Sequence, residues 1–335
     1  MTGAEPGRLR AFLFAVVSSA VAFVISFAAA EGIMRLKNAS MKDYSTEMWR
    51  YARELKVRSP DPRLGHEHIA NARATLQSVE IRTNAWGLRG GPVSITPQPG
   101  GRRILVLGSS IALGWGVDED KAVSSLLNAR FAANGRPVEV LNAGIGNYNA
   151  ERYVERFLSR LSVLAPTDLL VLAFVRDGEE LDEGGGNLLL RHSELAVTAW
   201  VAISRALGAR GESGLIDHYR AVYRPGSLAM ARMQAAFRTL ADHARRHGIR
   251  VTMAMVPDLH NLADYPLGFV HDIFARTARD NGFAYVDLLP ALQGLRPEEI
   301  WAMPGDAHPS ARGHAAMAEA ICPVLAPAVD AERRQ

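Results

Sequence analysis

Cysteine is almost absent from this chain of 335 residues, since Cys322 is the only one. A single cysteine excludes an intrachain disulfide framework, a cysteine-based zinc site and an iron–sulfur cluster. An excess of one charge is also lacking, because 38 Lys and Arg stand against 35 Asp and Glu, a formal net charge of +3. Nucleic acid is therefore not an expected partner, although the pI near 9.1 allows weak attraction to anionic surfaces.

Internal repeats, low-complexity tracts and nucleotide-binding motifs are missing as well. The turn after residue 107 has no Gly-Lys-Ser/Thr, and the one at 142–147 lacks the spacing of a dinucleotide fingerprint. No metal and no organic cofactor is therefore predicted. With 48% hydrophobic and 22% charged residues the chain has a globular composition, which excludes disorder throughout.

One long apolar run stands near the amino terminus. Residues 11–30 are 20 consecutive residues without a charge. At about 1.5 Å of rise per residue, a helix of this length crosses a hydrocarbon core of about 30 Å. The run therefore predicts a transmembrane helix.

Two membrane interpretations compete for this helix. The sequence Ala28-Ala29-Ala30 resembles a signal-peptide cleavage site, but the run is longer than the usual apolar region of about 7–15 residues. An uncleaved anchor is therefore favoured. Arg8 and Arg10 predict a cytoplasmic amino terminus. The expected location is the inner (cytoplasmic) membrane, spanned once, with the soluble domain on the periplasmic or extracellular side.

The chain divides into four segments by composition. We expect a cytoplasmic stub and anchor at 1–37, a pre-domain segment with short strands at 38–101, the main domain at 102–326 and a tail at 327–335. A strand is expected at 75–83, where apolar and polar residues alternate. Residues 178–224, with a Gly184–Gly186 break, predict a helical insertion or lid.

The main domain alternates apolar strands with helices. Ser227 predicts the start of a long helix and Gly248 its end. Strands are expected at 104–107, 138–141, 168–174, 249–256 and 285–288, and the other helices at 121–134, 150–164, 268–280 and 310–320. This pattern predicts an α/β fold with a three-layer, doubly wound parallel sheet. Reactive groups should then lie beyond the carboxyl ends of the strands.

Three short patterns carry candidate chemistry. Ser110 lies in a small-residue turn after the first apolar strand, and Gly144 in a similar turn after the second. Asp306 and His308 are two residues apart, so in an extended segment their side chains point the same way and the carboxylate can orient the imidazole. Each pattern alone also fits an ordinary strand–helix turn or a helix cap.

Taken together, the patterns resemble the SGNH/GDSL hydrolase superfamily, which has a flavodoxin-like fold. ILVLGSSIALGWGV resembles its nucleophile block, LNAGIGNY its second block and GDAHPSARGH its last block. The resemblance implies Ser110 as the reactive serine, Gly144 and the Ser110 amide as oxyanion donors, His308 as the base and Asp306 as its orienting acid. TNAWGLRG at 83–90 resembles a segment of membrane-anchored members.

Two positions depart from the family pattern. Ser109 stands where the family has the aspartate of Gly-Asp-Ser. Arg176, followed by Asp177, stands where an asparagine donates to the oxyanion. An arginine can also donate, but it is longer, and nearby carboxylates at Asp177, Glu179 or Glu180 can draw it away.

The resemblance implies three functions. The first is a serine esterase that acts outside the cytoplasm on an ester, an O-acylated glycan or lipid, with a Ser110–His308–Asp306 triad. The second is a cell-envelope polysaccharide O-acetyltransferase that uses the same acyl-enzyme, beside a membrane acyl-transfer partner. The third is a non-catalytic, membrane-tethered binding protein on a degenerate scaffold.

Other histidines receive ordinary interpretations. His66-Glu67-His68 has no third ligand at motif spacing, so a solvated loop is preferred to a metal site. His314 is expected on the surface of the last helix. Trp115 is assigned equally to an acyl pocket or to the core.

Overall fold

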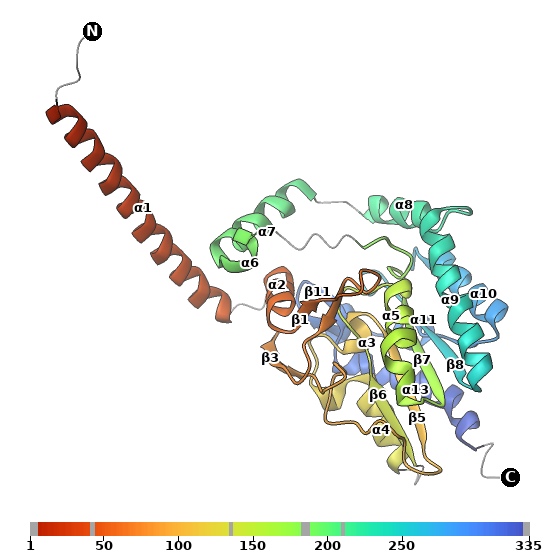
Figure 1. The fold of residues 1–335 in the computed structure, drawn as a ribbon. Coiled ribbons are helices and arrows are strands. Elements are labelled where there is room, and N and C mark those ends of the chain that lie inside the picture. Colours follow the sequence, from red (N-terminus) through yellow and green to blue (C-terminus); the bar gives the residue numbers. More distant parts are fainter. Residues whose placement is uncertain (1–5, 41–43, 134–136, 182–187, 209–211, 331–335) are drawn as a thin grey trace. The chain divides into compact units, whose positions relative to one another are not determined.

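The computed structural model describes residues 6–40, 44–133, 137–181, 188–208 and 212–330 (Figure 1). The chain divides into two compact units. The first comprises residues 1–49 and 184–209, and the second comprises 50–183 and 210–335. The sheet and the candidate site lie in the second unit, whereas the candidate membrane helix lies in the first.

A five-stranded sheet forms the centre of the second unit, and all its neighbouring strands are parallel. In spatial order the strands are β6 (Val138–Asn142), β5 (Arg102–Gly108), β7 (Asp168–Phe174), β8 (Arg250–Val256) and β9 (Ala284–Asp287). Numbered along the chain, this order is 2-1-3-4-5, which is the flavodoxin-like arrangement. The predicted doubly wound fold is confirmed, and all five predicted strands are present.

Helices cover both faces of this sheet. Leu105 and Leu107 of β5 lie in one buried cluster with the helices that cover one face of the sheet, the first group named below. Ile104 and Val106 lie in another buried cluster with the helices that cover the opposite face, the second group. Successive residues of a strand point to opposite faces, so the two clusters are the two outer interfaces of a three-layer fold. The first group is α5 (Ala150–Arg156), α9 (Leu228–His247) and α10 (Gly268–Asn281), and the second is α4 (Val123–Ala133) and α13 (Ala311–Asp330).

The predicted helix ends agree with the structure where a cap defines them. The Ser227 side chain accepts from the Met230 N–H at the start of α9, and Gly248 ends that helix with φ +66°. The helix expected at 150–164 is less regular, because after α5 the chain passes through a π turn at Phe157–Leu161 and a 3₁₀ turn at Ser162–Leu164.

Two small hairpins make up most of the pre-domain segment, after α2 (Tyr44–Glu54). β1 (Lys56–Arg58) pairs with β2 (His66–His68), and β3 (Arg73–Leu76) pairs with β4 (Val79–Arg82), both antiparallel. The single strand expected at 75–83 is therefore wrong. The chain reverses at Gln77 and Ser78, whose φ angles are +50° and +66°. Two-residue hairpin turns of this kind require positive φ at both positions.

The segment that interrupts the αβ rhythm is helical, as predicted. It contains α6 (Leu188–His192) and α7 (Glu194–Gly208), which belong to the first unit, and α8 (Glu212–Val222), which belongs to the second. The predicted Gly184–Gly186 break lies outside the described residues. Five further short elements are α3 (Ser110–Leu113), α11 (Leu289–Leu292), α12 (Pro297–Ile300), β10 (Trp301–Met303) and β11 (Asp306–Pro309).

The first unit begins with α1 (Pro6–Ser40), a helix of 35 residues. Residues Gly7–Asn38 are long and apolar enough to cross a membrane, and the most apolar stretch has 0% of its residues buried. Exposed side chains of this helix include Phe12, Phe14 and Phe23, each more than half accessible. The helix is therefore a candidate membrane span, which agrees with the expectation from residues 11–30.

Candidate active site

The candidate nucleophile is placed by a tight turn at the carboxyl end of β5. Gly108 ends the strand with φ +150°, and a Cβ there would lie 2.8 Å from the Leu172 carbonyl oxygen and 2.9 Å from the Ala112 Cβ. Only glycine fits this close approach. Ser110 follows two residues later as the first residue of α3, and its side chain is only partly buried. The hydroxyl is therefore held at the rim of the sheet within reach of a ligand.

His308 and Asp306 come from β11, a short strand that pairs with β10 outside the central sheet. The Ser110 Oγ lies 2.8 Å from the His308 Nε2, and the His308 Nδ1 lies 2.6 Å from the Asp306 Oδ1. The His308 backbone N–H also donates to the Asp306 Oδ1, at 3.1 Å. The structure thus brings together the three predicted triad residues, although Ser110 and His308 are 198 positions apart in the chain.

The hydrogen-bond directions follow from the chemistry of the three groups. An ionised carboxylate only accepts, so the His308 Nδ1 carries the proton that is donated to Asp306. The His308 Nε2 is then unprotonated and accepts from the Ser110 hydroxyl. This is the tautomer that a general base requires.

Two further side chains hold the Asp306 carboxylate, and sequence reasoning missed both roles. The Gln77 Nε2 donates to the Asp306 Oδ2 at 2.7 Å, and the Trp115 Nε1 donates to the same oxygen at 3.2 Å. Burial by itself raises the pKa of Asp306, but the hydrogen bonds from His308 and Gln77 outweigh it and lower the pKa below its usual value. The carboxylate therefore stays ionised beside the imidazole.

A buried chain of hydrogen bonds joins β2 to the loop after β6. The His68 Nδ1 lies 2.9 Å from the Gly87 carbonyl oxygen, and the His68 Nε2 lies 2.6 Å from the Tyr51 hydroxyl oxygen. That hydroxyl accepts from the Gly146 N–H at 2.9 Å. Burial, with a smaller effect of the Arg156 charge, lowers the pKa of His68 to about 3. His66 and His68 are thus buried residues of a strand, and the expectation of a solvated loop is wrong.

Gly144 lies in the loop after β6, where it allows close packing. A Cβ at this position would lie 2.1 Å from the Leu113 backbone nitrogen. Its own N–H donates to the Asn142 Oδ1 at 3.0 Å. The amide is therefore engaged inside the loop in this structure, and its predicted part in an oxyanion hole stays a prediction.

Arg176 is held by a carboxylate, as its neighbours suggested. The Arg176 Nε lies 2.9 Å from the Glu179 Oε2, and half of the arginine side chain is exposed. The other Glu179 oxygen lies 3.1 Å from the His218 Nε2. Arg176 is thus tied to the loop after β7, and its contribution to an oxyanion hole also stays a prediction.

Asp177 is buried beneath this loop. Its Oδ2 accepts from the Tyr153 hydroxyl at 2.9 Å and from the Phe174 N–H at 3.1 Å. Desolvation raises the pKa of Asp177 to about 7. The folded protein therefore keeps this proton at pH values where the unfolded chain has released it.

This raised pKa predicts a pH-dependent effect of Asp177→Asn. Between pH 4 and 7 the folded chain binds the extra proton, so wild-type stability falls as the pH rises. A pKa of Asp177 raised from 3.8 to about 7 lowers the free energy of unfolding of the wild type at pH 8 by about 4 kcal/mol relative to low pH. Urea unfolding should therefore show the variant more stable than wild type at pH 8, with a smaller gap at pH 5.

The exposed Asp217 provides the matched control. The difference in free energy of unfolding between Asp217→Asn and wild type should not depend on pH. An Asp177→Asn gap that narrows between pH 5 and pH 8 would contradict the burial argument.

His314 is fully buried, contrary to the expected surface position. It lies in the first turn of α13, which packs against the start of α4, and its Nδ1 accepts from the Val123 N–H at 3.3 Å. Desolvation lowers the pKa of His314 to about 3, so the ring is neutral. The residue joins two helices of the core.

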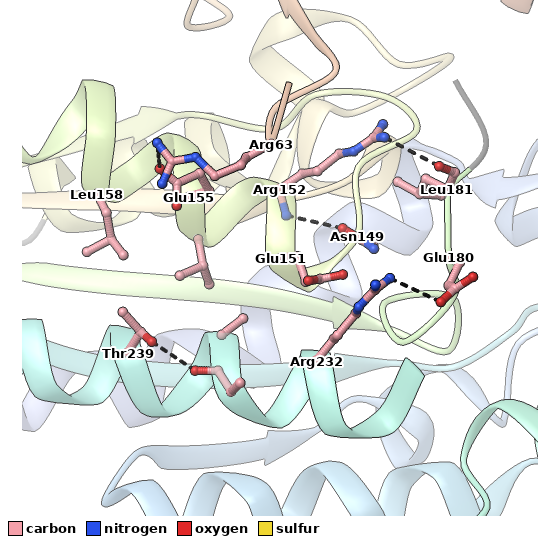
Figure 2. Close-up of a pocket in the computed structure, with 13 residues that line it drawn as sticks. Arg63, Asn149, Glu151, Arg152, Glu155, Leu158, Glu180, Leu181, Arg232 and Thr239 are labelled. Atoms are coloured by element: carbon pink, nitrogen blue, oxygen red, sulfur yellow. Dashed lines mark hydrogen bonds and ion pairs between the residues drawn. The ribbon is translucent and has the colours of Figure 1, made fainter. Parts of the chain in front are cut away.

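A separate groove of about 490 Å³ runs between α5 and α9 (Figure 2). Two ion pairs lie among its lining residues, Arg232 with Glu180 at 3.1 Å and Arg63 with Glu155 at 2.9 Å. Neither Ser110 nor His308 lines it. The groove is therefore separate from the candidate triad.

Comparison with known proteins gives matches only among solved structures. No family model and no curated protein matches the chain. TesA is 18% identical and covers 68% of this chain and 99% of its own, with a TM-score of 0.45. The psychrotrophic esterase EstA from a Pseudoalteromonas species is 13% identical, with coverages of 68% and 99% and a TM-score of 0.43.

A third match is a protein from Desulfitobacterium hafniense that is named for the G-D-S-L family. It is 13% identical and covers 67% of this chain and 100% of its own, with a TM-score of 0.43.

Proposed function

We propose that this chain is a serine esterase, with Ser110 as nucleophile, His308 as general base and Asp306 as the acid that orients it. One observation carries the proposal: the Ser110 Oγ lies 2.8 Å from the His308 Nε2, and the opposite ring nitrogen lies 2.6 Å from Asp306. A general base must lie within about 2.6–3.2 Å of the heavy atom whose proton it removes.

The mechanism follows from these contacts. His308 takes the Ser110 proton as the serine oxygen attacks the ester carbonyl, and the carbonyl oxygen becomes an oxyanion. The protonated His308 then gives its proton to the leaving alcohol, and an acyl-serine remains. Water, deprotonated by His308, attacks this intermediate; the bond to the Ser110 Oγ breaks, His308 returns the proton to that oxygen, and the acid is released. Asp306 stabilises the imidazolium throughout without taking the proton.

The oxyanion needs hydrogen-bond donors near Ser110. We assign the Ser110 backbone N–H to this role, together with Gly144 and Arg176 once the substrate competes for them. In the structure the Gly144 N–H is bonded to Asn142, and Arg176 is paired with Glu179. Each donor lost typically costs about 10²–10³ in turnover, so these two engagements predict a slow enzyme in their present arrangement.

The candidate span α1 supports a site of action at the cell envelope. If α1 anchors the chain in the inner membrane with the amino terminus in the cytoplasm, the soluble part meets O-acylated glycans or lipids outside. The same anchor supports a second candidate, transfer of the acyl group to a glycan hydroxyl beside a membrane acyl-transfer partner. A non-catalytic binding role draws support from the Arg176–Glu179 ion pair alone.

Supplying an acyl donor and an envelope glycan together separates hydrolysis from transfer. The detergent-solubilised full chain is incubated with an aryl acetate and a deacetylated glycan, and free acetate and acetylated glycan are both measured. Esterase action predicts that acetate accounts for most of the turnover. A product mixture dominated by acetylated glycan would replace the esterase assignment with the transferase.

Gln77 is expected to affect turnover through Asp306. Gln77→Leu removes one hydrogen bond to the Asp306 Oδ2. In the described contacts, the Trp115 Nε1 is then the remaining side-chain donor to that oxygen. We expect kcat for an aryl ester to fall about tenfold with KM little changed, since a hydrogen bond to a charged group is worth about 1.5–3 kcal/mol. Steady-state kinetics at pH 8 measures both constants.

Gln77→Glu tests whether this effect acts on the charge of Asp306. A second carboxylate beside Asp306 should lower kcat further at pH 8, and part of the loss relative to wild type should disappear at lower pH, where a protonated Glu can donate. Glu80→Gln in the same hairpin is the control, because Glu80 is exposed. Equal losses for both Gln77 variants at every pH would assign Gln77 to packing alone.

A further inference from the structure

Helix α7 exposes large apolar side chains. Residues 195–204 contain no charged residue. Trp200 and Ile203 are nevertheless 51% and 53% exposed, and Leu189 on the preceding α6 is 55% exposed. Trp200 and Ile203 are three positions apart, so they share one face of the helix. This face is costly to leave in water, which points to an apolar environment around it.

The amino-terminal turn of α7 is fixed to the last turns of α1 within the same unit. The Glu31 carboxylate accepts from the Ser193 Oγ at 2.8 Å and from the N–H groups of Glu194 at 2.9 Å and Leu195 at 3.1 Å. These are the free amides of a helix start, and a carboxylate stabilises them.

A second set of contacts fixes which face of α7 lies against α1. The Asn38 Nδ2 donates to the Glu194 Oε2 at 2.9 Å and to the Thr198 Oγ1 at 3.3 Å. The Arg35 Nη2 donates to the His192 carbonyl oxygen at 2.8 Å. The face of α7 that carries Thr198 is thus turned to α1, while Trp200 and Ile203 are exposed.

The position of Glu31 along α1 sets the depth of α7. The uncharged run at residues 11–30 is as long as the hydrocarbon core is thick, so Glu31 is the first residue beyond it. Helix α7 therefore begins at the boundary between hydrocarbon and headgroups. Its apolar stretch, Glu194–Ser204, has 11 residues and a length of about 16 Å, too short to cross a bilayer. An apolar helix of this length that is not buried in a core suits the interface.

We propose that α7 is a membrane-surface helix that lies at the outer headgroup boundary and places Trp200 and Ile203 in lipid. The occupant of this apolar face is the bilayer in which α1 is anchored, so the inference rests on the proposed anchoring. Tryptophan is favoured at this depth because its ring is apolar and its N–H remains hydrated. Each apolar side chain that α7 buries adds to the membrane attachment that α1 provides.

Fluorescence quenching in vesicles tests the proposal with the full chain. The protein is reconstituted into phosphatidylcholine vesicles with or without lipids brominated near the top of their acyl chains. Trp200 is one of five tryptophans, so its quenching should remove about one fifth of the emission if all five emit equally. Trp200→Phe should abolish this bromine-dependent loss, and Trp301→Phe, the matched control, should keep it.

The outcomes separate this inference from the anchoring on which it rests. Flotation of the chain with the vesicles, together with a bromine-dependent loss that requires Trp200, supports the membrane-surface helix. Flotation with equal quenching of wild type and Trp200→Phe overturns the membrane-surface helix and leaves the anchor in place. Crosslinking of Trp200 to a partner protein, without bromine-dependent quenching, has the same meaning. A chain that does not float overturns both.

Discussion

Ser110→Ala is expected to lower kcat/KM for a short-chain aryl ester by about 10⁴-fold or more. Without the hydroxyl there is no nucleophile for His308 to activate, and only binding and any oxyanion donors remain. The Ser110 Oγ lies 2.8 Å from the His308 Nε2, so the loss should appear mainly in kcat. Initial rates with the purified full chain in detergent measure it.

Ser109→Ala provides the matched control for this variant. Ser109 is the preceding residue, is 8% exposed, and makes no side-chain capping bond to α3. It should retain activity within about threefold, since the change removes one buried oxygen that takes no part in the Ser110–His308–Asp306 contacts. Residual activity of Ser110→Ala above a tenth of wild type would remove Ser110 from the mechanism.

Asp306→Asn is expected to lower kcat by about 10⁴-fold while the fold is kept. An asparagine amide that donates to the His308 Nδ1 reverses the tautomer, so that the Nε2 carries the proton and faces Ser110 as a donor. The imidazole can then no longer accept the serine proton. The measurement is kcat at pH 8, together with circular dichroism to confirm folding.

A second His–Asp pair in the same domain gives a chemically identical control. The His271 Nδ1 lies 2.9 Å from the Asp287 Oδ1, and the His271 Nε2 lies 2.9 Å from the Tyr265 hydroxyl oxygen. Asp287→Asn makes the same change in a pair without a serine, and activity should change by no more than about twofold per folded molecule. Similar losses in both variants would mean that the effect of Asp306→Asn is general destabilisation.

The fold could be predicted because its signals are local. Every residue of β5 is buried, as expected of a strand covered on both faces, and such strands read as continuous apolar runs. The turn glycine Gly108 and the cap Ser227 act on their immediate neighbours, so the chain sequence around them was sufficient. The meeting of Ser110 with His308 required more, namely the combined motif resemblance, because nothing local connects them.

The surroundings of the site could not be predicted, because they depend on contacts between distant segments. Gln77 reaches Asp306 across 229 positions from a hairpin turn that lacks the usual Asn-Gly signal. The burial of His68 and His314 likewise depends on which helix or loop covers them. Glu31 meets α7 only after the insertion has folded back onto α1, and no pattern in either segment indicates the other.

Labelling with a serine-directed fluorophosphonate tests the central assignment most directly. The full chain is treated with the reagent at pH 8, digested, and analysed by mass spectrometry to locate the phosphonyl group. We expect one adduct on Ser110, formed at least about 10³ times more slowly in His308→Ala, because the base is lost. An unmodified Ser110, or labelling of Ser110 at an equal rate in both proteins, would contradict it.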